Sequence, residues 1–305
     1  MTPVQTEGGQ ALETRAFGST DLQLRAMGLG GLLARYEGIE GHPPPEEKRR
    51  IYLRAAELGI NLFDTGYGDE IHIPDELKGP DDERYFSLKA GAPDAGQLEK
   101  IVDDNLRNLR REAIDILRIH HHAYMENEDL RERIAELKLA GKVRALCLIR
   151  HYRAAQEAYA RRGPEPDTDG DLVIYNYVCR WQETGIDMAR QSGKGVLIMK
   201  ALGGQWLNWA EQVRTDWEIT DEEEVVRLAP LGESIRRDLE LVYPIVSGPW
   251  GELARPGEDV PLTSRAIEWV QRNVGVSSVL VAVASVEELE EATGVAEASP
   301  VAGGS

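Results

Sequence analysis

The sequence predicts a single (β/α)8 barrel, preceded by a β-hairpin and carrying a long insertion after the seventh strand. Apolar runs typical of buried strands alternate with amphipathic runs typical of helices through most of the 305 residues. This alternation indicates a parallel sheet, because parallel neighbours need a crossover, which is usually a helix. Chemically reactive side chains also follow several successive strands. That placement favours a barrel, which gathers its site at the strand ends, over a doubly wound open sheet.

The predicted elements follow in order. Leu12 to Phe17 and Leu22 to Met27, split by Gly18-Ser19-Thr20, predict the hairpin, and a weak first barrel strand is expected at 24–29. A helix begins after Pro43-Pro44-Pro45 and ends at Gly59. Further strands are expected at 60–64, 84–88, 113–119, 143–149, 172–176, 196–199 and 277–283. Further helices are expected at 95–109, 128–140, 151–162, 183–192 and 263–273, with a last one opened by Ser285; the first and the last of these have capping-box spacing.

One domain is predicted over residues 12–298, with disordered tails at 1–11 and 299–305. Residues 203–262 interrupt the alternation and are too long for a simple connection. They hold four of the six tryptophans, at Trp206, Trp209, Trp217 and Trp250. We interpret this segment as a lid or substrate-pocket insertion over the active face. An extra packing layer or a dimer contact is the alternative, so an oligomer remains open.

Composition excludes several classes of partner. The formal net charge of −18 argues against binding to nucleic acid or to an anionic membrane surface. No stretch approaches the roughly 20 apolar residues that span a bilayer. The N-terminal residues have neither the basic start nor the apolar core of a signal peptide, so a cytoplasmic location is expected. Two cysteines, Cys147 and Cys179, cannot form a disulfide framework or a four-cysteine metal site.

Three consecutive strand ends carry a carboxylate, a phenol, an ammonium group and an imidazole. NLFDTGYGDE places Asp64 and Tyr67 after one strand, FSLKAG places Lys89 at the end of the next, and DILRIHHHAY places His120 at the third. Reduction of a carbonyl group needs a proton donor for the oxygen while hydride arrives at carbon. A tyrosine serves if a neighbouring cation lowers its pKa from near 10.

These motifs resemble those of the aldo-keto reductases. The matching residues are Asp64-Thr65-Gly66 with Tyr67-Gly68, Lys89, and Asp115 to His120; Gly141-Lys142-Val143-Arg144, GVLIMKALGG at 195–204 and the closing strand and helix extend the likeness. The resemblance implies a (β/α)8 barrel that transfers hydride between NAD(P)H and the aldehyde or ketone group of a small molecule. It also implies the catalytic set. Tyr67 is the general acid, Lys89 lowers the pKa of its phenol, Asp64 holds and orients Lys89, and His120 binds the carbonyl oxygen.

The sequence departs from the family mainly where the family holds its nucleotide. Only two residues separate Asp64 from Tyr67, where the family usually has four. Where the family has a Ser-Asn pair and a Gln, this sequence has Ile149-Arg150 and Leu172. The basic residue that binds the 2′-phosphate in the family aligns with Ala284, and the Asn that binds adenine aligns with Ala292. The implied cofactor is therefore NADP or NAD. NADP is slightly preferred from the resemblance, although the partner of its 2′-phosphate is missing.

Further residues are candidates for cofactor and substrate contacts. Cofactor binding is predicted at Arg150, Tyr175, Lys200 and Ser285, and substrate binding at His122, Tyr124, His151 and Trp206. The His120-His121-His122 run suggests a metal, but neighbours in a strand point to opposite faces. We therefore predict no metal site, with His120 pointing inward and His122 on the rim.

Two other functions stay open. A lyase, dehydratase or isomerase acting on a small carbonyl compound would use the same Tyr, Lys, Asp and His side chains without nicotinamide. A non-catalytic binding or regulatory subunit is the third possibility, because the fold alone does not define function.

Overall fold

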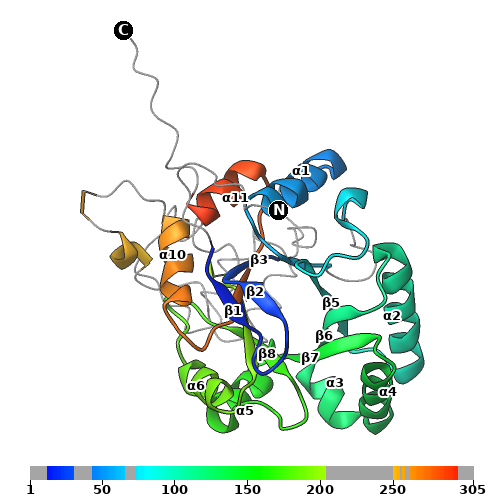
Figure 1. Cartoon of the computed structure of the whole chain (residues 1–305). Helices are drawn as coiled ribbons and strands as arrows, with labels where there is room; N and C mark the ends of the chain where they lie inside the picture. The colour runs from blue at the N-terminus through cyan, green and yellow to red at the C-terminus, as the bar shows by residue number, and fades with distance from the viewer. Residues whose placement is uncertain are drawn as a thin grey trace, which may run out of the picture.

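A closed barrel of eight parallel strands forms the centre of the protein (Figure 1). The computed structural model describes residues 12–30, 43–65, 73–203, 250–254, 256–257 and 262–294. Around the barrel the strands follow the order β10-β3-β4-β5-β6-β7-β8-β9. Their bounds are β3 Met27–Leu29, β4 Leu62–Asp64, β5 Tyr85–Gly91, β6 Ile114–His120, β7 Val143–Ile149, β8 Gly170–Ile174, β9 Gly195–Met199 and β10 Ser278–Val281. The predicted (β/α)8 barrel is confirmed.

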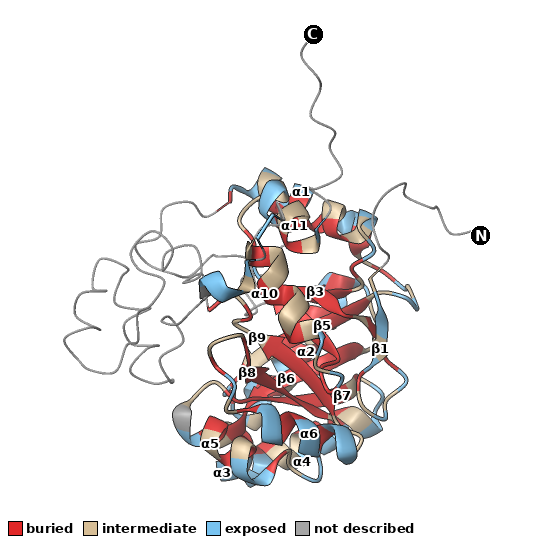
Figure 2. Ribbon diagram, turned by 90° about the vertical axis from the view of Figure 1, so that its left-hand side faces the viewer, coloured by how far each residue is buried: buried red, intermediate tan, exposed pale blue. Residues whose placement is uncertain are grey.

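Helices surround the barrel and turn their exposed faces outward, while the strands are almost entirely buried (Figure 2). The α-helices are α1 Pro45–Glu57, α2 Ala95–Leu109, α3 His121–Glu126, α4 Glu128–Leu139, α5 Arg153–Arg162, α6 Glu183–Gln191, α10 Leu262–Gln271 and α11 Val286–Thr293. Two 3-10 helices are η1 Asp75–Leu77 and η3 Trp250–Leu253. The predicted capping box of α2 is present: Gln97 N donates to Asp94 Oδ1 at 2.7 Å, and Asp94 N donates to Gln97 Oε1 at 3.0 Å.

The hairpin of β1 (Thr14–Ala16) and β2 (Gln23–Arg25) closes the N-terminal end of the barrel. Phe17, at the turn, is fully buried and packs with side chains from seven of the barrel strands. Gly170 and Gly195 make room for its ring, since a Cβ on Gly195 would lie 2.2 Å from Phe17 Cδ2. The carboxyl-terminal end of the strands, opposite this hairpin, is where such a barrel builds its active site.

Several predicted boundaries were wrong; β5, for example, was expected at 84–88 and runs from Tyr85 to Gly91. The first barrel strand begins at Met27, because Gln23–Arg25 belong to the hairpin. The strand expected at 172–176 lies at 170–174, where Gly170 pairs with Gly195. The chain after His120 is helix α3 and not a continued strand. Of the predicted insertion, residues 204–249, 255 and 258–261 lie outside the described residues, as do both predicted tails.

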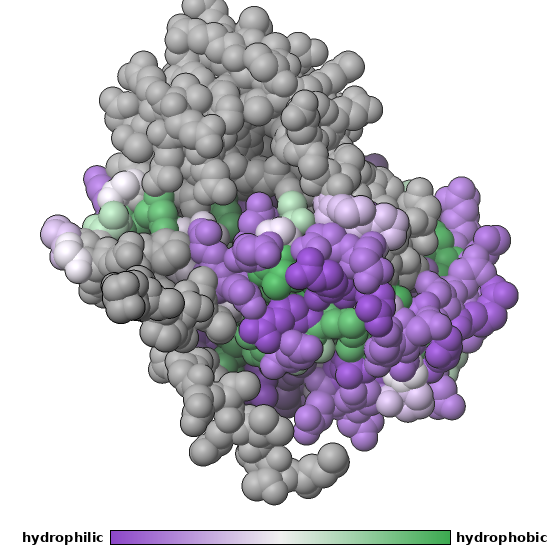
Figure 3. All heavy atoms as spheres, turned by 90° about the horizontal axis from the view of Figure 1, so that it is seen from above, coloured by the Kyte–Doolittle hydropathy of each residue, from purple (hydrophilic) through white to green (hydrophobic). Residues whose placement is uncertain are grey.

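The described surface is strongly hydrophilic when it is seen from above, with small hydrophobic areas between charged groups (Figure 3). Within the described ranges, no helix is long and apolar enough to cross a membrane.

Candidate active site at the strand ends

The carboxyl-terminal ends of β4, β5 and β6 bring three predicted catalytic residues to one rim of the barrel. Asp64 is the last residue of β4, Lys89 lies near the end of β5, and His120 is the last residue of β6. These strands are hydrogen-bonded neighbours, with Asp64 opposite Ser87 and Lys89 opposite Arg118. The predicted general acid Tyr67 lies outside the described residues, so its place relative to this rim stays a prediction.

Asp64 forms an ion pair with a residue that the sequence analysis did not single out. Arg118 Nη2 donates to Asp64 Oδ1, and the two side chains are 3% and 9% exposed. A buried charge without a partner costs far more than a paired one, so each group holds the other inside the barrel. Asp64 is thus fixed from the side of β6.

His120 is a buried, uncharged imidazole near neutral pH. Burial lowers its pKa to about 4, and the positive charges of Lys89 and Arg118 and the nearby His122 act in the same direction. Its Nδ1 is buried and has no hydrogen-bond partner among the described residues. A neutral imidazole with an unused polar atom at the rim is suited to hydrogen-bond a carbonyl oxygen without giving up its proton.

Aromatic and imidazole rings from two strand ends form a wall beside His120. The rings of His120 and His122 are stacked with centroids 5.5 Å apart, and Tyr152 lies 5.5 Å from His120 and 5.2 Å from His122. His151 is next to Tyr152 at 5.7 Å, and its pKa lies well below the usual value because of burial and the charges of Lys200 and Lys89. The candidate substrate residues His122 and His151 therefore share one wall. His122 lies on helix α3. The prediction for the histidine run assumed a continued strand, and this assumption was wrong.

The depressed pKa of His120 predicts a pH-dependent contribution to stability. The unfolded chain takes up this proton near pH 6.5 and the folded chain only near 4, so the stabilisation is complete above pH 6.5 and is lost as pH falls towards 4. Between these values we expect wild type to lose about 3 kcal/mol more than His120→Asn. Urea unfolding at a series of pH values measures the difference. Parallel pH dependences for the two proteins would contradict the low pKa.

Arg150, a candidate cofactor residue, has no exposed surface. Its Nε donates to Asp171 Oδ1 at 2.6 Å, its guanidinium lies over the Tyr159 ring at 5.4 Å, and Glu165 Oε1 is 3.6 Å from Nη2. Complete burial raises the pKa of the Asp171 carboxyl to about 6, while Arg150 acts to lower it. Arg150 has a structural ion pair in the barrel wall, and this location is a poor one for contacting a nucleotide.

The other candidate cofactor residues lie at different sides of the barrel. Tyr175 is buried against Trp269 of α10, with its hydroxyl 2.9 Å from Glu183, and burial and that contact raise its pKa to about 12. Lys200 directly follows β9, at the same rim as the catalytic residues, and has a positive φ of 57°. Ser285 caps α11, where Glu288 N donates to its Oγ at 3.2 Å.

Of the remaining substrate candidates, Tyr124 lies on α3 within the hydrophobic core and is 8% exposed. Trp206 lies outside the described residues. Among the described side chains, no three of the His, Cys, Asp and Glu type gather where they could hold a metal ion.

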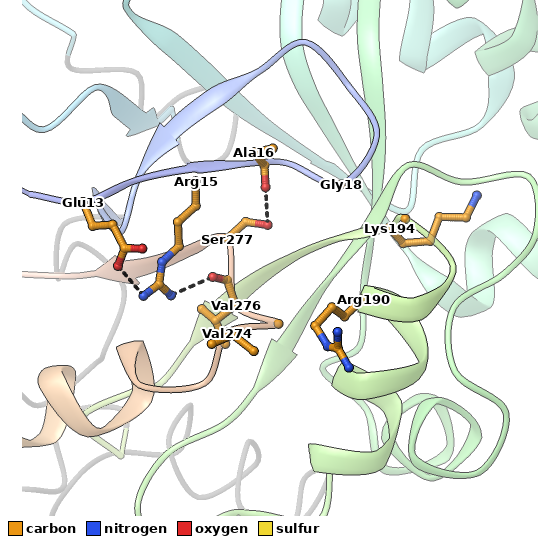
Figure 4. A pocket seen from close by; sticks show the side chains of 11 residues that line it. Glu13, Arg15, Ala16, Gly18, Arg190, Lys194, Val274, Val276 and Ser277 are labelled. Carbon is orange, nitrogen blue, oxygen red and sulfur yellow. Dashed lines mark hydrogen bonds and ion pairs between the residues drawn. The ribbon is translucent and has the colours of Figure 1, made fainter.

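A cavity of about 280 Å³ lies at the other end of the barrel, between the hairpin and the start of β10 (Figure 4). Arg15 is its most prominent charged group, and it pairs with Glu13 at 2.6 Å and donates to the Val276 carbonyl at 2.9 Å. Its donors serve the fold at the hairpin. The cavity contains none of the predicted catalytic residues.

Comparisons with known proteins show the family to which the chain belongs. The sequence profile of the aldo/keto reductase family matches residues 26–301, which is most of the chain. The chain belongs to the aldo/keto reductase family. The protein is therefore an oxidoreductase of the aldo-keto reductase type, and the family generally uses NAD(P)H.

Solved structures of the family share the fold. Aldo-keto reductase AKR11C1 from Bacillus halodurans, in its holo form, has 18% identity and a TM-score of 0.62 over 95% of this chain and 92% of that one. A putative aldo-keto reductase from Pseudomonas aeruginosa has 19% identity and a TM-score of 0.62 over 95% and 96%. The glycerol dehydrogenase AKR11B4 from Gluconobacter oxydans has 19% identity and a TM-score of 0.62 over 94% and 90%.

Sequence reasoning missed two residues that the structure brings to the catalytic rim. Arg118 is two positions before His120 on β6 and contacts Asp64, and Tyr152 contacts three of the protein's histidines. The signal for Arg118 was a charged residue two positions before His120, the spacing that places both side chains on one face of the strand.

Proposed function

We propose that this member of the family reduces the aldehyde or ketone group of a small molecule with a nicotinamide nucleotide. The observation that carries the proposal is the buried, neutral His120 with an unpartnered Nδ1, at the same rim as Asp64 and Lys89. This combination supports a site for an oxygen atom that gains negative charge during reaction.

The nucleotide supplies hydride to the carbonyl carbon when it is bound. His120 donates a hydrogen bond to the carbonyl oxygen and orients it. Tyr67 gives that oxygen its proton, and Lys89 lowers the phenol's pKa and stabilises the phenolate left behind. Asp64, held by its ion pair with Arg118, orients Lys89, as the family resemblance implies.

For the nucleotide, the first turn of α11 favours NADH over NADPH. This turn is where the family resemblance places the adenosine 2′-phosphate, and here it is occupied by carboxylates. Val286 N donates to Glu47 Oε1 at 3.1 Å, and Ala284 N donates to Glu288 Oε2 at 2.6 Å. The pKa of the Glu287 carboxyl lies below its usual value, first because its own backbone amide donates to it, so a third negative charge is present. Arg50, which pairs with Glu47 at 2.6 Å, partly offsets these charges, but a 2′-phosphate would still meet the carboxylates and the occupied donors, whereas a 2′-hydroxyl carries no charge to be repelled.

A second function is supported by the other half of the nucleotide site. The family's Ser-Asn pair is replaced by Ile149, which is apolar and 2% exposed, and by Arg150, whose guanidinium is buried on Asp171. Ile149 has no side-chain donor, and the Arg150 guanidinium is completely buried, so its donors are not accessible to a nicotinamide amide. A cofactor-free isomerase, dehydratase or lyase that moves protons with Tyr67 and His120 is the function that this observation favours.

A turnover assay separates the two functions. Purified protein is incubated with NADH or NADPH and a panel of aldehydes and ketones, and nucleotide oxidation is followed optically. Glycerol is included in the oxidation direction, because a glycerol dehydrogenase shares the fold. Carbonyl-dependent NADH oxidation supports the reductase. Substrate conversion without nucleotide supports the second function and overturns the first.

A further inference from the structure

The interior of the barrel contains a buried positive charge beneath the catalytic rim. On β6, residues Ile116, Arg118 and His120 alternate on one face, and Ile116 belongs to the interior cluster around Phe17. Arg118 therefore lies inside the barrel, one layer below His120. Its side chain is 3% exposed, so solvent water screens its charge far less than it would screen a cation at the surface.

Its partner, Asp64, comes from the strand on the far side of β5. In β4, Leu62 and Asp64 share a face, and Leu62 also belongs to the interior cluster. Side chains of alternate strands form one layer inside such a barrel, and β4 and β6 are alternate strands. Arg118 Nη2 reaches Asp64 Oδ1 across this layer, and Arg118 Nε has no partner among the described residues.

We propose that Arg118 is a positioning residue of the active site: its guanidinium holds the Asp64 carboxylate in place and sets a permanent positive charge beneath His120. The catalytic part of this inference rests on the proposed function. A guanidinium stays protonated at every pH at which the protein is folded, so this charge cannot be switched off as a lysine's can. It touches Asp64 and no reacting atom, so it acts through Asp64 and His120.

The positive charge of Arg118 affects the protonation of His120 together with the other described groups that face this imidazole. Lys89 faces it from β5, His122 from α3, and Tyr152 with His151 from the turn after β7. Those with a marked electrostatic effect on it, Lys89, His122 and Arg118, all oppose its protonation. Loss of Arg118 would remove one of these charges and the ion pair that it forms with Asp64. Both changes favour the protonated imidazole, which can give its proton to the carbonyl oxygen instead of only binding it.

The test is an NMR titration of histidine-labelled protein without any nucleotide, with the His120 signal assigned from its loss in His120→Asn. In Arg118→Met we expect the pKa of His120 to rise above its wild-type value, because one of the charges that lower it is gone. In Arg118→Lys, which keeps the charge, it should stay close to the wild-type value. The matched control is Arg144→Met, which removes another arginine bound to a buried strand aspartate, Asp115, at 2.6 Å. That variant should leave His120 unchanged.

An unchanged His120 titration in folded Arg118→Met, or an equal rise in Arg144→Met, overturns the proposal. If Arg118→Met does not fold, Arg118→Gln takes its place with the same expectation, because glutamine donates to Asp64 without a charge. Where turnover is measurable, Arg118→Met should also lower kcat by about tenfold or more, with partial rescue in Arg118→Lys. The titration needs no nucleotide, so it decides the role of Arg118 even if the reductase function fails.

Discussion

Replacing Tyr67 with phenylalanine should reduce kcat for carbonyl reduction by about 10²- to 10⁴-fold, the usual contribution of a general acid. The substitution removes only the hydroxyl that protonates the carbonyl oxygen, so nucleotide affinity should change little. Steady-state kinetics with the best substrate of the panel, together with nucleotide titration of the variant, measure both quantities. Because only two residues separate Asp64 from Tyr67 in the sequence, this substitution is the sharpest check on the catalytic assignment.

Tyr159→Phe is the matched control for that experiment. Tyr159 is fully buried on α5, and its hydroxyl has no hydrogen-bond partner among the described residues. Its loss should leave kcat within a few-fold of wild type. A Tyr67→Phe enzyme with wild-type kcat would show that another group supplies the proton, and Tyr152, beside His120, would be the first to examine.

Lys89→Met should have an effect of similar size, with kcat lowered by about 10²- to 10⁴-fold. Without the ammonium group, the phenol's pKa is no longer lowered and the phenolate formed in the reaction is not stabilised. Lys89 also lowers the pKa of His120, so the His120 titration should move upward in this variant. The change in kcat and the change in the His120 titration are thus two independent measures of the effect of the Lys89 ammonium charge.

Lys142→Met serves as its control. Lys142 pairs with Asp103 at 2.7 Å just before β7 begins, at the opposite end of the barrel. Removing it eliminates one ammonium charge and one ion pair far from the catalytic rim, so kcat and the His120 titration should both stay near wild type. Equal losses in the two lysine variants would mean that kcat responds to net charge or stability and not to the site.

Local chemistry predicted much of the fold. The capping box at Asp94 and the Gly59 stop lie next to the elements that they define, and the bounds of α2 were predicted without error. The strand ends at Asp64 and His120 were found for the same reason, since each follows a short apolar run. Lys89 was predicted to end its strand, but β5 continues to Gly91.

Long-range contacts account for what was missed. β8 begins at Gly170-Asp171, a pair with low strand propensity, because Gly170 fits against Phe17 and Asp171 binds Arg150. Arg118 lies 54 residues from its partner Asp64, and no local pattern connects them. Helix α3 begins without a side-chain cap at His120, so the histidine run gave no sign that the strand ends there.

The most direct test of the reductase is the binding of NADH and of NADPH to the purified protein, followed by nucleotide fluorescence and by thermal stability. We predict saturable binding at micromolar concentrations, with NADH tighter because carboxylates surround the first turn of α11. Tighter binding of NADPH would contradict the preference for NADH and leave the reductase in place. No binding of either nucleotide to the folded protein at millimolar concentrations would contradict the reductase itself and leave the cofactor-free reaction at the same rim.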